Sequence, residues 1–581
     1  MIFLQVFLFF QLQYFIIGKI LYLSNDCFRG RKAIDYPDVY EFYGIPYALP
    51  PLKQYRFLPP KPTYDTRGMY GARCIDANVR AKTCIFTRTA QNFSKNDIWS
   101  IFQSEMSEDC LQLNMWIPRK PAGPVLVHFV GPNYEAGNSY MPYSDGSILA
   151  HMTKTIVITV HYRVGVFGFA LMGKKSKVPG NMGLLDQQLA LKYIYKNIDE
   201  IGGDRRKITI FGHGTDGASA TAHLFSEESK RYFSKVIAFS GTITHDWALE
   251  KKKAIVYDNF NRLAEAVGCD RFLEDKVLKC MQKIDAEILS LEADQIYNLE
   301  QSILKYPFLP IDNDRKFFKS PIKRKLKFGD FKRNVSIVIG KSSDEGSLGM
   351  VQYLNKKKYG CQLNYKKPAN NKLNQCKMNK KQYDEVFELV ARDADLKRKA
   401  VPDLQNIYKP KKPTNDERRN TALRLISDIA YDCDYIKFSG EVSGFLYGNE
   451  YFFNFKKRLS RSKWPKWMGV VRGEELLYLF GHSYKFPFVY DRKKLEDEQN
   501  FSRQAMKTLF KFLNTGKLYK SWKPFNPWEP YGVDIDRYMY PYEHFASENV
   551  TKLECFKIGS LLQKEKSPIN RRFISDYLNQ G

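Results

Sequence analysis

The sequence contains the stretch Lys207-Ile-Thr-Ile-Phe-Gly-His-Gly-Thr-Asp-Gly-Ala-Ser219, and this stretch decides the fold. Its first residues form a short apolar run rich in β-branched side chains, which is typical of a buried strand. The glycines that follow predict a tight turn. The small residues after the turn predict a helix. A strand, a tight turn and a helix in this order indicate one unit of an α/β fold.

Strands and helices alternate around this unit. Short β-like runs are expected around Lys19–Leu23, Val125–Val130 and Thr155–Tyr162, and a strand over Ile208–Phe211. Asp186–Asn197 has apolar residues at helical spacing. The alternation predicts a large, mostly parallel central sheet with helices on both faces. No internal repeat and no inter-domain linker interrupts it.

The composition is that of a globular protein with an unusual charge. Hydrophobic residues make up 44% of the 581 residues and aromatic residues 15%, which excludes a disordered chain. The net charge of +28 predicts attraction to acidic surfaces. A general bias toward Lys, Asn and Tyr is the alternative explanation. No basic helix, zinc-finger spacing or RNA-binding motif is present, so a nucleic-acid partner is not expected.

The N-terminal residues favour secretion. Ile2 to Ile17 are mostly apolar and uncharged, which suits a signal peptide over residues 1–17, although the positive n-region is missing. Lys19 interrupts the run below the length of a membrane span, and no later segment is apolar enough to follow it as a transmembrane helix. A single domain is therefore expected over residues 18–581, in an extracellular protein.

Sequons and cysteines agree with that compartment. Asn-x-Ser/Thr sequons place candidate glycosylation sites at Asn92, Asn334, Asn500 and Asn549. The ten cysteines, an even number, are compatible with five disulfides in an oxidising environment.

Two segments are strongly basic. Arg315 to Arg333 is dense in Lys and Arg, and Lys356 to Lys381 holds nine lysines and no acid together with Cys361 and Cys376. The second segment predicts an insertion at about residues 352–382. It is either a solvated surface loop or a disulfide-stapled basic loop presented to a polyanion.

An ordered series of motifs gives the chain a family resemblance. The motifs are Phe42-Tyr-Gly-Ile-Pro-Tyr-Ala48, Arg56-Phe57, Ser107-Glu-Asp-Cys-Leu111, Tyr162-Arg-Val-Gly-Val-Phe-Gly-Phe169, Pro179-Gly-Asn-Met-Gly-Leu-Leu-Asp-Gln187, Gly202-Gly-Asp204, Ile210-Phe-Gly212, Asp344-Glu-Gly346 and Trp467-Met-Gly469. In this order, from about residue 18 to 560, they resemble the type-B carboxylesterase/cholinesterase family. The resemblance extends to the non-catalytic members of the neuroligin, neurotactin, gliotactin and glutactin kind. It implies one α/β-hydrolase domain with Arg163 and Asp186 as a buried, structural ion pair.

The resemblance also implies disulfide pairs. Cys269 and Cys280 have the spacing of the family's second disulfide, and Cys433 and Cys555 resemble its long-range bridge. Cys110 resembles the closing end of the first loop, with either Cys84 or Cys74 as its partner, and the remaining cysteine would pair with Cys27. Cys361 and Cys376 would be an added bridge in the basic insertion.

Three family positions carry the chemistry of ester hydrolysis: a serine nucleophile, a histidine base and an acid that orients the histidine. Carried over, they fall on Gly214, Arg472 and Glu345. The glycine has no side chain, and an arginine stays protonated and cannot act as a general base. Only the acid is retained, so the resemblance implies a pseudoenzyme.

The oxyanion loop departs from the family pattern independently. The relict donor positions are Pro132, Asn133 and Thr215, and Pro132 has no N–H. Losing one such donor typically costs about 2.7–4 kcal/mol of the barrier. Thr215, Ser219, His213 and His482 are the residues near the motifs that offer a substitute nucleophile or base, and we expect none of them to serve.

Two hypotheses concern the remnant of the site. Glu345 is expected to form an ion pair with Arg472. Gly214 is expected to relieve the backbone strain of the elbow, because glycine adopts such φ values without penalty, and to make room for Asp216, which replaces the second glycine of the motif.

The leading functional hypothesis is a secreted, catalytically inactive protein that acts by binding or adhesion. Its partners would be an extracellular protein or an acidic glycan, and no metal or cofactor is expected. One alternative is a weak or altered ester hydrolase. Another is a binder of a small apolar ligand in the remnant gorge, where Trp99 lies close to a family ligand-stacking position, although its spacing from Cys110 differs by about one residue and core packing is the better explanation. A homodimer through a C-terminal helix within Lys552–Leu562 stays open.

Overall fold

The computed structural model describes most of the chain. It leaves out residues 1–18, 25, 64–73, 87–104, 132–143, 174–175, 271–272, 301, 303–304, 365, 538–546, 551 and 566–581. The expected signal peptide, Asn92, Trp99, Pro132 and Asn133 therefore lie outside the described residues.

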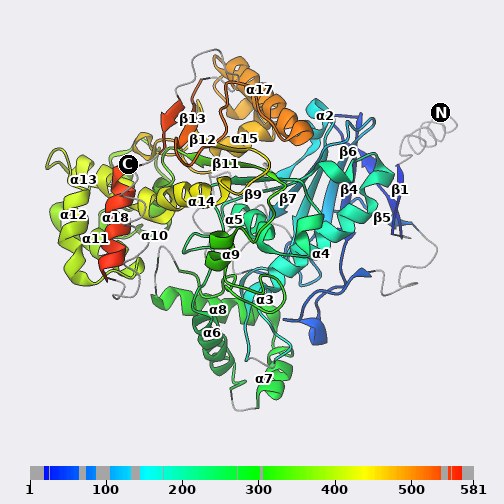
Figure 1. Cartoon of the computed structure of the whole chain (residues 1–581), viewed down its shortest axis with the longest axis horizontal. Helices are drawn as coiled ribbons and strands as arrows, with labels where there is room; N and C mark the ends of the chain where they lie inside the picture. The colour runs from blue at the N-terminus through cyan, green and yellow to red at the C-terminus, as the bar shows by residue number, and fades with distance from the viewer. Residues whose placement is uncertain are drawn as a thin grey trace, which may run out of the picture.

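A large twisted sheet runs through the middle of the molecule (Figure 1). In spatial order its eleven described strands are β14 (Ser547–Asn549), β13 (Tyr531–Ile535), β12 (Glu450–Phe455), β11 (Ser336–Ser342), β10 (Lys235–Phe239), β9 (Ile208–His213), β7 (Val125–Val130), β8 (Ile156–His161), β6 (Gln112–Pro118), β4 (Val39–Pro46) and β3 (Arg31–Lys32). The strands from β8 to β13 pair in parallel, and antiparallel pairs occur toward both edges. A small separate sheet joins β1 (Ile20–Leu23), β2 (Asp26–Arg29) and β5 (Ile75–Asp76).

Both faces of the central sheet are buried, which explains the continuous apolar runs in the sequence. Along β7, Val125, Val127 and Phe129 belong to one hydrophobic cluster, whereas Leu126 belongs to another. This alternation follows from the two-residue period of a strand.

Helices cover the two faces. On the side of the larger cluster lie α3 (Gly165–Phe169), α4 (Met182–Asn197), α5 (Thr215–Ala222), α6 (Lys253–Ala266), α7 (Glu274–Met281), α8 (Ala286–Glu300), α9 (Ile322–Phe328), α11 (Lys380–Asp393), α12 (Val401–Ile407), α13 (Asn415–Ser427), α14 (Cys433–Ser443) and α18 (Leu553–Glu565). On the other side lie α2 (Ser147–Thr153), α15 (Glu474–Leu479) and α17 (Leu495–Thr515), with α16 (His482–Lys485) beside them. The expected α/β-hydrolase architecture, a mostly parallel sheet between helices, is confirmed.

The predicted elements agree closely with the observed ones. The strand at Val125–Val130 is β7 itself, and the runs at Thr155–Tyr162 and Lys19–Leu23 contain β8 and β1. The helix expected at Asp186–Asn197 begins earlier, at Met182, and β9 continues two residues beyond Phe211. The helix expected within Lys552–Leu562 is α18.

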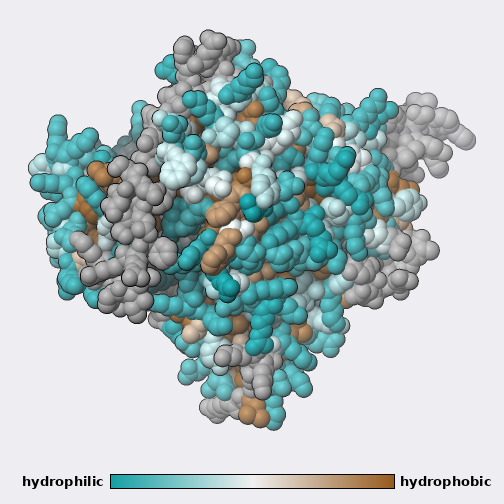
Figure 2. All heavy atoms as spheres, viewed as in Figure 1, coloured by the Kyte–Doolittle hydropathy of each residue, from teal (hydrophilic) through white to brown (hydrophobic). Residues whose placement is uncertain are grey.

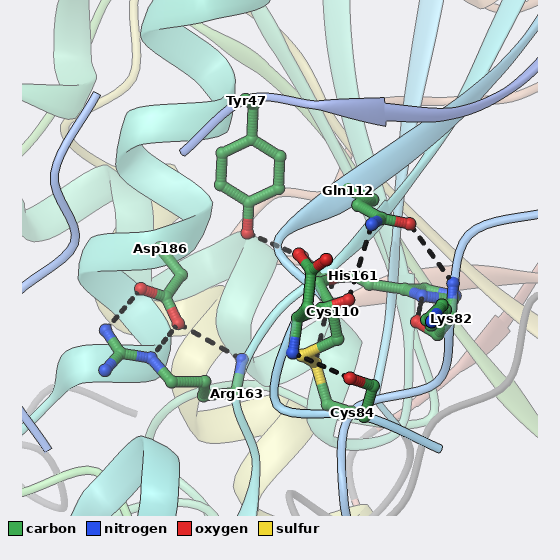
Figure 3. The surroundings of a disulfide bond; sticks show 10 residues. Tyr47, Lys82, Cys84, Cys110, Gln112, His161, Arg163 and Asp186 are labelled. Carbon is green, nitrogen blue, oxygen red and sulfur yellow. Dashed lines mark hydrogen bonds and ion pairs between the residues drawn. A yellow bond between two sulfur atoms is a disulfide. The ribbon is translucent and has the colours of Figure 1, made fainter. Parts of the chain in front are cut away.

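All ten cysteines form disulfides. The pairs are Cys27–Cys74, Cys84–Cys110, Cys269–Cys280, Cys361–Cys376 and Cys433–Cys555. The structure thus assigns Cys84 rather than Cys74 to Cys110. Figure 3 shows this bridge, with the buried ion pair of Arg163 and Asp186 in the same view. The guanidinium donates twice to the carboxylate, at 2.8 and 2.7 Å, so the expected structural pair is confirmed.

The sequons differ in their surroundings. Asn334 is exposed just before β11, whereas Asn500 lies within α17 and is only partly exposed. Asn549 lies in β14, and its side chain is not described. Within the described residues, no helix is long and apolar enough to cross a membrane.

Candidate functional site

The turn between β9 and α5 has the geometry of a nucleophile elbow. Gly214 stands at the N-terminus of α5 with φ 65° and ψ −124°, a conformation that favours glycine. Gly212 allows the strand and the helix to approach, because a Cβ there would lie 2.1 Å from the backbone of Asp216. The backbone of the elbow is therefore retained around a residue that has no side chain.

Arg472 occupies the space beside Gly214. A Cβ at residue 214 would lie 2.6 Å from Nη2 of Arg472, and the nearest atoms around it all belong to this guanidinium. Arg472 comes from the segment between β12 and α15, so residues far apart in the sequence meet here. The expectation that Gly214 makes room for Asp216 is wrong, because the space beside Gly214 is filled by Arg472.

Glu345 is the acidic partner of Arg472. Its Oε2 lies 3.6 Å from Nε of Arg472, so the expected ion pair is confirmed. Oε1 accepts hydrogen bonds from the Ser240 hydroxyl at 2.6 Å and from the Ser342 amide at 2.9 Å. Burial raises the pKa of the fully buried Glu345 to about 7, although Arg472 acts in the opposite direction.

Further contacts hold the guanidinium in place. Nη2 of Arg472 donates to the carbonyl of Ser240 at 2.8 Å. The guanidinium carbon lies 4.9 Å from the ring centroid of Tyr431 and 5.4 Å from that of Trp247. Both distances are within the range of cation–π attraction. The Arg472 side chain is 11% exposed. These contacts make it a packed part of the site.

A second ionisable pair lies next to the elbow. Nε2 of His213 is 3.2 Å from Oε1 of Glu475, and both side chains are buried. The other oxygen of Glu475 accepts from the amide of Gly473 at 3.0 Å and from the Ser342 hydroxyl at 3.2 Å. Burial lowers the pKa of His213, although Glu475 acts in the opposite direction. His213 is therefore held against an acid within the protein interior.

Asp216 points away from the elbow, toward the strand that precedes the oxyanion loop. Its Oδ2 accepts from the amide of Gly131 at 3.1 Å, and its Oδ1 accepts from the Tyr162 hydroxyl at 2.6 Å. Burial raises the pKa of Asp216 to about 7, opposed by these two hydrogen bonds. The Thr215 hydroxyl donates to the Gly131 carbonyl at 3.4 Å. Both side chains are thereby turned toward Gly131.

Comparison of the sequence with known proteins shows the family to which the chain belongs. The sequence model described as "Carboxylesterase family" matches residues 19–553. The chain belongs to the carboxylesterase family. The match spans the described fold up to the first residue of α18 and includes every element that contributes to the site described above.

Named relatives of this carboxylesterase-family chain are cholinesterases. "Acetylcholinesterase 4" of Caenorhabditis briggsae is 29% identical over 515 residues, which cover 84% of this chain and 80% of the relative. "Cholinesterase" of Mus musculus is 30% identical over 480 residues, covering 82% and 75%. "Acetylcholinesterase" of Bungarus fasciatus is 29% identical over 504 residues, covering 86% and 78%.

The other side chains considered as substitutes in this carboxylesterase fold are engaged elsewhere. Ser219 lies inside α5, is fully buried, and accepts from Nε2 of Gln187 at 3.1 Å. Nδ1 of His482 lies 3.0 Å from the Tyr490 hydroxyl. The Ser229 hydroxyl does approach His223, at 2.8 Å from Nδ1, but both residues are fully buried. None of these contacts presents a serine–histidine pair beside Gly214.

The sequence did not reveal several partners in the site. Ser240 bridges Glu345 and Arg472, and the rings of Trp247 and Tyr431 flank the guanidinium. No sequence motif marks these residues. Ser240 and Trp247 lie between β10 and α6, and Tyr431 lies in a short π-helix, Asp428–Asp432, more than 180 residues further along the chain. No group of His, Cys, Asp and Glu side chains suited to a metal ion occurs in the part of the chain that the structure describes.

Proposed function

We propose that this carboxylesterase-family protein is catalytically inactive and acts outside the cell by binding other molecules. One observation carries the proposal: the guanidinium of Arg472 occupies the place where a side chain at residue 214 would project. The site therefore holds a packed cation at the position of the reacting hydroxyl. No nucleophile is therefore present at this position to attack the carbonyl carbon of an ester substrate.

The remaining chemistry of the site supports this proposal. A general base must accept a proton near neutral pH, and the pKa of Arg472 lies above its already high ordinary value, because the surrounding Tyr431 and Glu345 outweigh burial. The acid of the family triad orients a neutral histidine, but Glu345 here pairs with a permanent cation. Arg472 and Glu345 therefore form an ion pair and do not form a chain of groups that could transfer a proton.

Five disulfides in one chain support the extracellular location. They close loops from Cys27–Cys74 near the start of the described residues to Cys433–Cys555 near their end, and such bonds persist in oxidising compartments. Exposed Asn334 offers a glycosylation site consistent with secretion. A secreted, glycosylated binding protein accounts for the retention of the carboxylesterase fold without its chemistry.

Catalysis is tested with the purified mature chain. Hydrolysis of p-nitrophenyl acetate and acetylthiocholine is measured beside a cholinesterase as a positive control, with a heat-denatured sample as the blank. Labelling by a fluorophosphonate reports an activated serine independently of substrate choice. We expect rates equal to the blank and no labelling. Turnover above the blank that is removed by the fluorophosphonate would establish a hydrolase and refute the proposal.

Binding is tested separately. The immobilised mature chain is incubated with solubilised extracellular material, and retained molecules are identified after washing at increasing salt. A bovine serum albumin column serves as the control for non-specific retention. We expect retained glycans or proteins that elute with salt. If nothing is retained beyond the albumin control, a binding function is contradicted even where the esterase assay is negative.

A further inference from the structure

A strongly basic part of the described surface is the lysine loop, defined as residues 356–381. Its nine lysines are all exposed, and it contains no acidic residue. The loop connects α10 (Gly346–Tyr353) to the start of α11, so it belongs to the same end of the molecule as α11, α12 and α13. Figure 1 places these helices at the left end, which Figure 2 shows as predominantly hydrophilic.

The lysine loop is held in one shape by its own side chains. Cys361 and Cys376 form its disulfide, and both are buried. Asn374 lies at the centre of the loop, where its Oδ1 accepts from the Asn364 amide at 2.7 Å. Its Nδ2 donates to the carbonyls of Asn364 and Pro368, at 3.2 and 3.0 Å. The charges are thus displayed on a pre-organised surface, which reduces the entropy lost on binding.

The loop is also fixed to the body of the protein. Nε1 of Trp467 donates to the carbonyl of Asn374 at 2.8 Å. Arg419 donates to the carbonyl of Gln375 at 2.7 Å and lies 5.1 Å from the Trp467 ring centroid. Leu363 packs against a small buried cluster that includes Met468 and Val471. The lysine loop therefore has a defined position beside the segment that carries Arg472.

A second group of lysines, Lys409, Lys411 and Lys412, adjoins the loop. The hydroxyl of Tyr383 in α11 donates to the carbonyl of Tyr408 at 2.7 Å. The amide of Met378 donates to the carbonyl of Asn415 at 3.2 Å. The three lysines lie between Tyr408 and Asn415. The first of these residues is thus bonded to α11, and the second is bonded to the lysine loop. All three lysines are exposed.

Few of these charges are neutralised within the protein. Lys358 pairs with Glu385 at 2.9 Å, and Lys380 pairs with Asp384 at 2.5 Å. Among the described residues, no ion pair is found for Lys357, Lys366, Lys367, Lys372, Lys377, Lys381, Lys409, Lys411 and Lys412. An array of like charges on a rigid surface is repulsive by itself, and a polyanion relieves that repulsion.

We propose that the lysine loop and the adjoining lysines 409–412 bind a linear sulfated polysaccharide. The proposal rests on the proposed extracellular binding function, since such polymers occur there, and it names the partner and the surface. Lysine ammonium groups act as point charges toward sulfates spaced along a chain. Stable binding to a membrane combines basic residues with a buried apolar face or a lipid anchor, whereas the one large exposed apolar side chain described in the loop is Leu373. The charge array therefore favours a hydrated glycan.

The test compares two full-length variants of equal charge. In the loop variant, Lys366, Lys367, Lys372 and Lys377 are changed to glutamine. In the control variant, the exposed lysines Lys253, Lys276, Lys279 and Lys283 of the α6–α7 end are changed in the same way. Affinity for a heparin octasaccharide is measured by calorimetry between about 50 and 300 mM salt, where screening changes most.

We expect the loop variant to bind the octasaccharide at least about tenfold more weakly than the unmodified chain, with a shallower salt dependence, because fewer counterions are released per complex. The control variant should keep nearly the full affinity. Equal losses in the two variants would show that net charge alone attracts heparin and would overturn the assignment. So would undiminished binding by the loop variant.

A footprint locates the surface without mutation. Acetylation of lysines by an N-hydroxysuccinimide ester is followed by mass spectrometry with and without the octasaccharide. We expect protection of Lys366, Lys367, Lys372 and Lys377, and none at Lys276 or Lys283. Protection confined to other lysines contradicts the proposal, as does binding to phosphatidylserine vesicles or an acidic protein in preference to heparin. Esterase activity is assayed on the same samples, so a failure of glycan binding is distinguishable from a failure of the proposed inactivity.

Discussion

Nη2 of Arg472 lies 2.6 Å from the point where a side chain at Gly214 would place its Cβ atom. The guanidinium of Arg472 therefore fits beside the elbow because residue 214 has no side chain. A larger residue at 214 displaces the guanidinium, and a smaller residue at 472 leaves a void beside the elbow. Arg472 also pairs with Glu345, so a substitution at residue 214 that moves the guanidinium should also alter its ion pair with the buried carboxylate.

Restoring the serine should destabilise the protein. Gly214→Ser places a side chain at φ 65°, a cost of about 1–3 kcal/mol, and adds the contact with Arg472. Urea unfolding and the Tm report the change. The same substitution in an Arg472→Ala background is the control, and it should cost less, with a coupling of about 0.5–3 kcal/mol. A higher Tm for Gly214→Ser would contradict the geometry.

Removing the guanidinium should destabilise more than removing the carboxylate charge. Arg472→Ala leaves Glu345 buried without its counter-charge, and breaking a buried pair in this way costs about 3–5 kcal/mol when the remaining group stays ionised. Because burial raises the pKa of Glu345 to about 7 even beside Arg472, the cost should be smaller near pH 7, where the carboxyl can take up a proton, and should grow as the pH rises. Glu345→Gln keeps a polar group for Ser240 and Ser342 and should cost less. Adding Glu345→Gln to Arg472→Ala should recover part of the loss. Unchanged thermal stability of Arg472→Ala would show that the pair contributes nothing.

Asp216 should make stability depend on pH. Its pKa is about 7 in the folded protein and near 3.8 in the unfolded chain, so the folded state binds the proton more tightly. The contribution of Asp216 is fully present below about pH 4 and is lost as pH rises through 7. The difference approaches about 4 kcal/mol at 1.36 kcal/mol per pKa unit.

Asp216→Asn isolates this effect. The neutral amide can still accept from Gly131, so the substitution removes the titration while keeping that hydrogen bond. Urea unfolding at pH 5, 6, 7 and 8 should show a flatter profile for the variant than for the unmodified chain. Parallel profiles over this range would mean that Asp216 does not titrate there.

Rebuilding the triad should yield activity only in combination. Gly214→Ser alone lacks a base and should show no turnover, because Arg472 holds its proton. Gly214→Ser with Arg472→His places a serine and a histidine next to Glu345 and should hydrolyse p-nitrophenyl acetate weakly. Adding Pro132→Gly restores an N–H and should raise the rate by about 100-fold or more. Equal rates for all three variants would contradict this assignment of the triad positions.

Of the sequons at Asn334 and Asn500, we expect only the one at Asn334 to carry a glycan. Asn334 is exposed ahead of β11, whereas Asn500 lies in α17, where Ser502 of its sequon is buried and donates to the Tyr478 carbonyl. Asn334→Gln should remove one glycan from the secreted protein, seen as a mobility shift that peptide N-glycosidase abolishes. Asn500→Gln should cause no shift. The reverse pattern would show that the sequon is modified before α17 packs.

Local patterns predicted the central strands well and the element ends less well. The apolar runs at β7 and β8 were predicted as strands because they are short and rich in β-branched residues, whereas a buried helix would be longer. The start of α4 lies four residues before the expected Asp186, and the end of β9 lies two residues beyond the expected Phe211. Asn181 precedes α4 and Gly214 follows β9, and both have positive φ values that the local pattern does not specify. The choice between Cys74 and Cys84 likewise required the fold, because spacing allows either pair.

The sequence by itself determined the fold, the family and the identity of the residues that correspond to the family's triad, because these follow from local periodicity and from motifs that are contiguous in the chain. Only the tertiary structure decided what fills the space beside Gly214. That space is enclosed by the elbow, by Glu345 and by the loop that carries Arg472, and the physical reason is steric: side-chain volume is shared between residues that the chain brings together only on folding. The same holds for the lysine loop: its charges are visible in the sequence, but its shape and its attachment to the body of the protein depend on the contacts of Asn374 and Trp467.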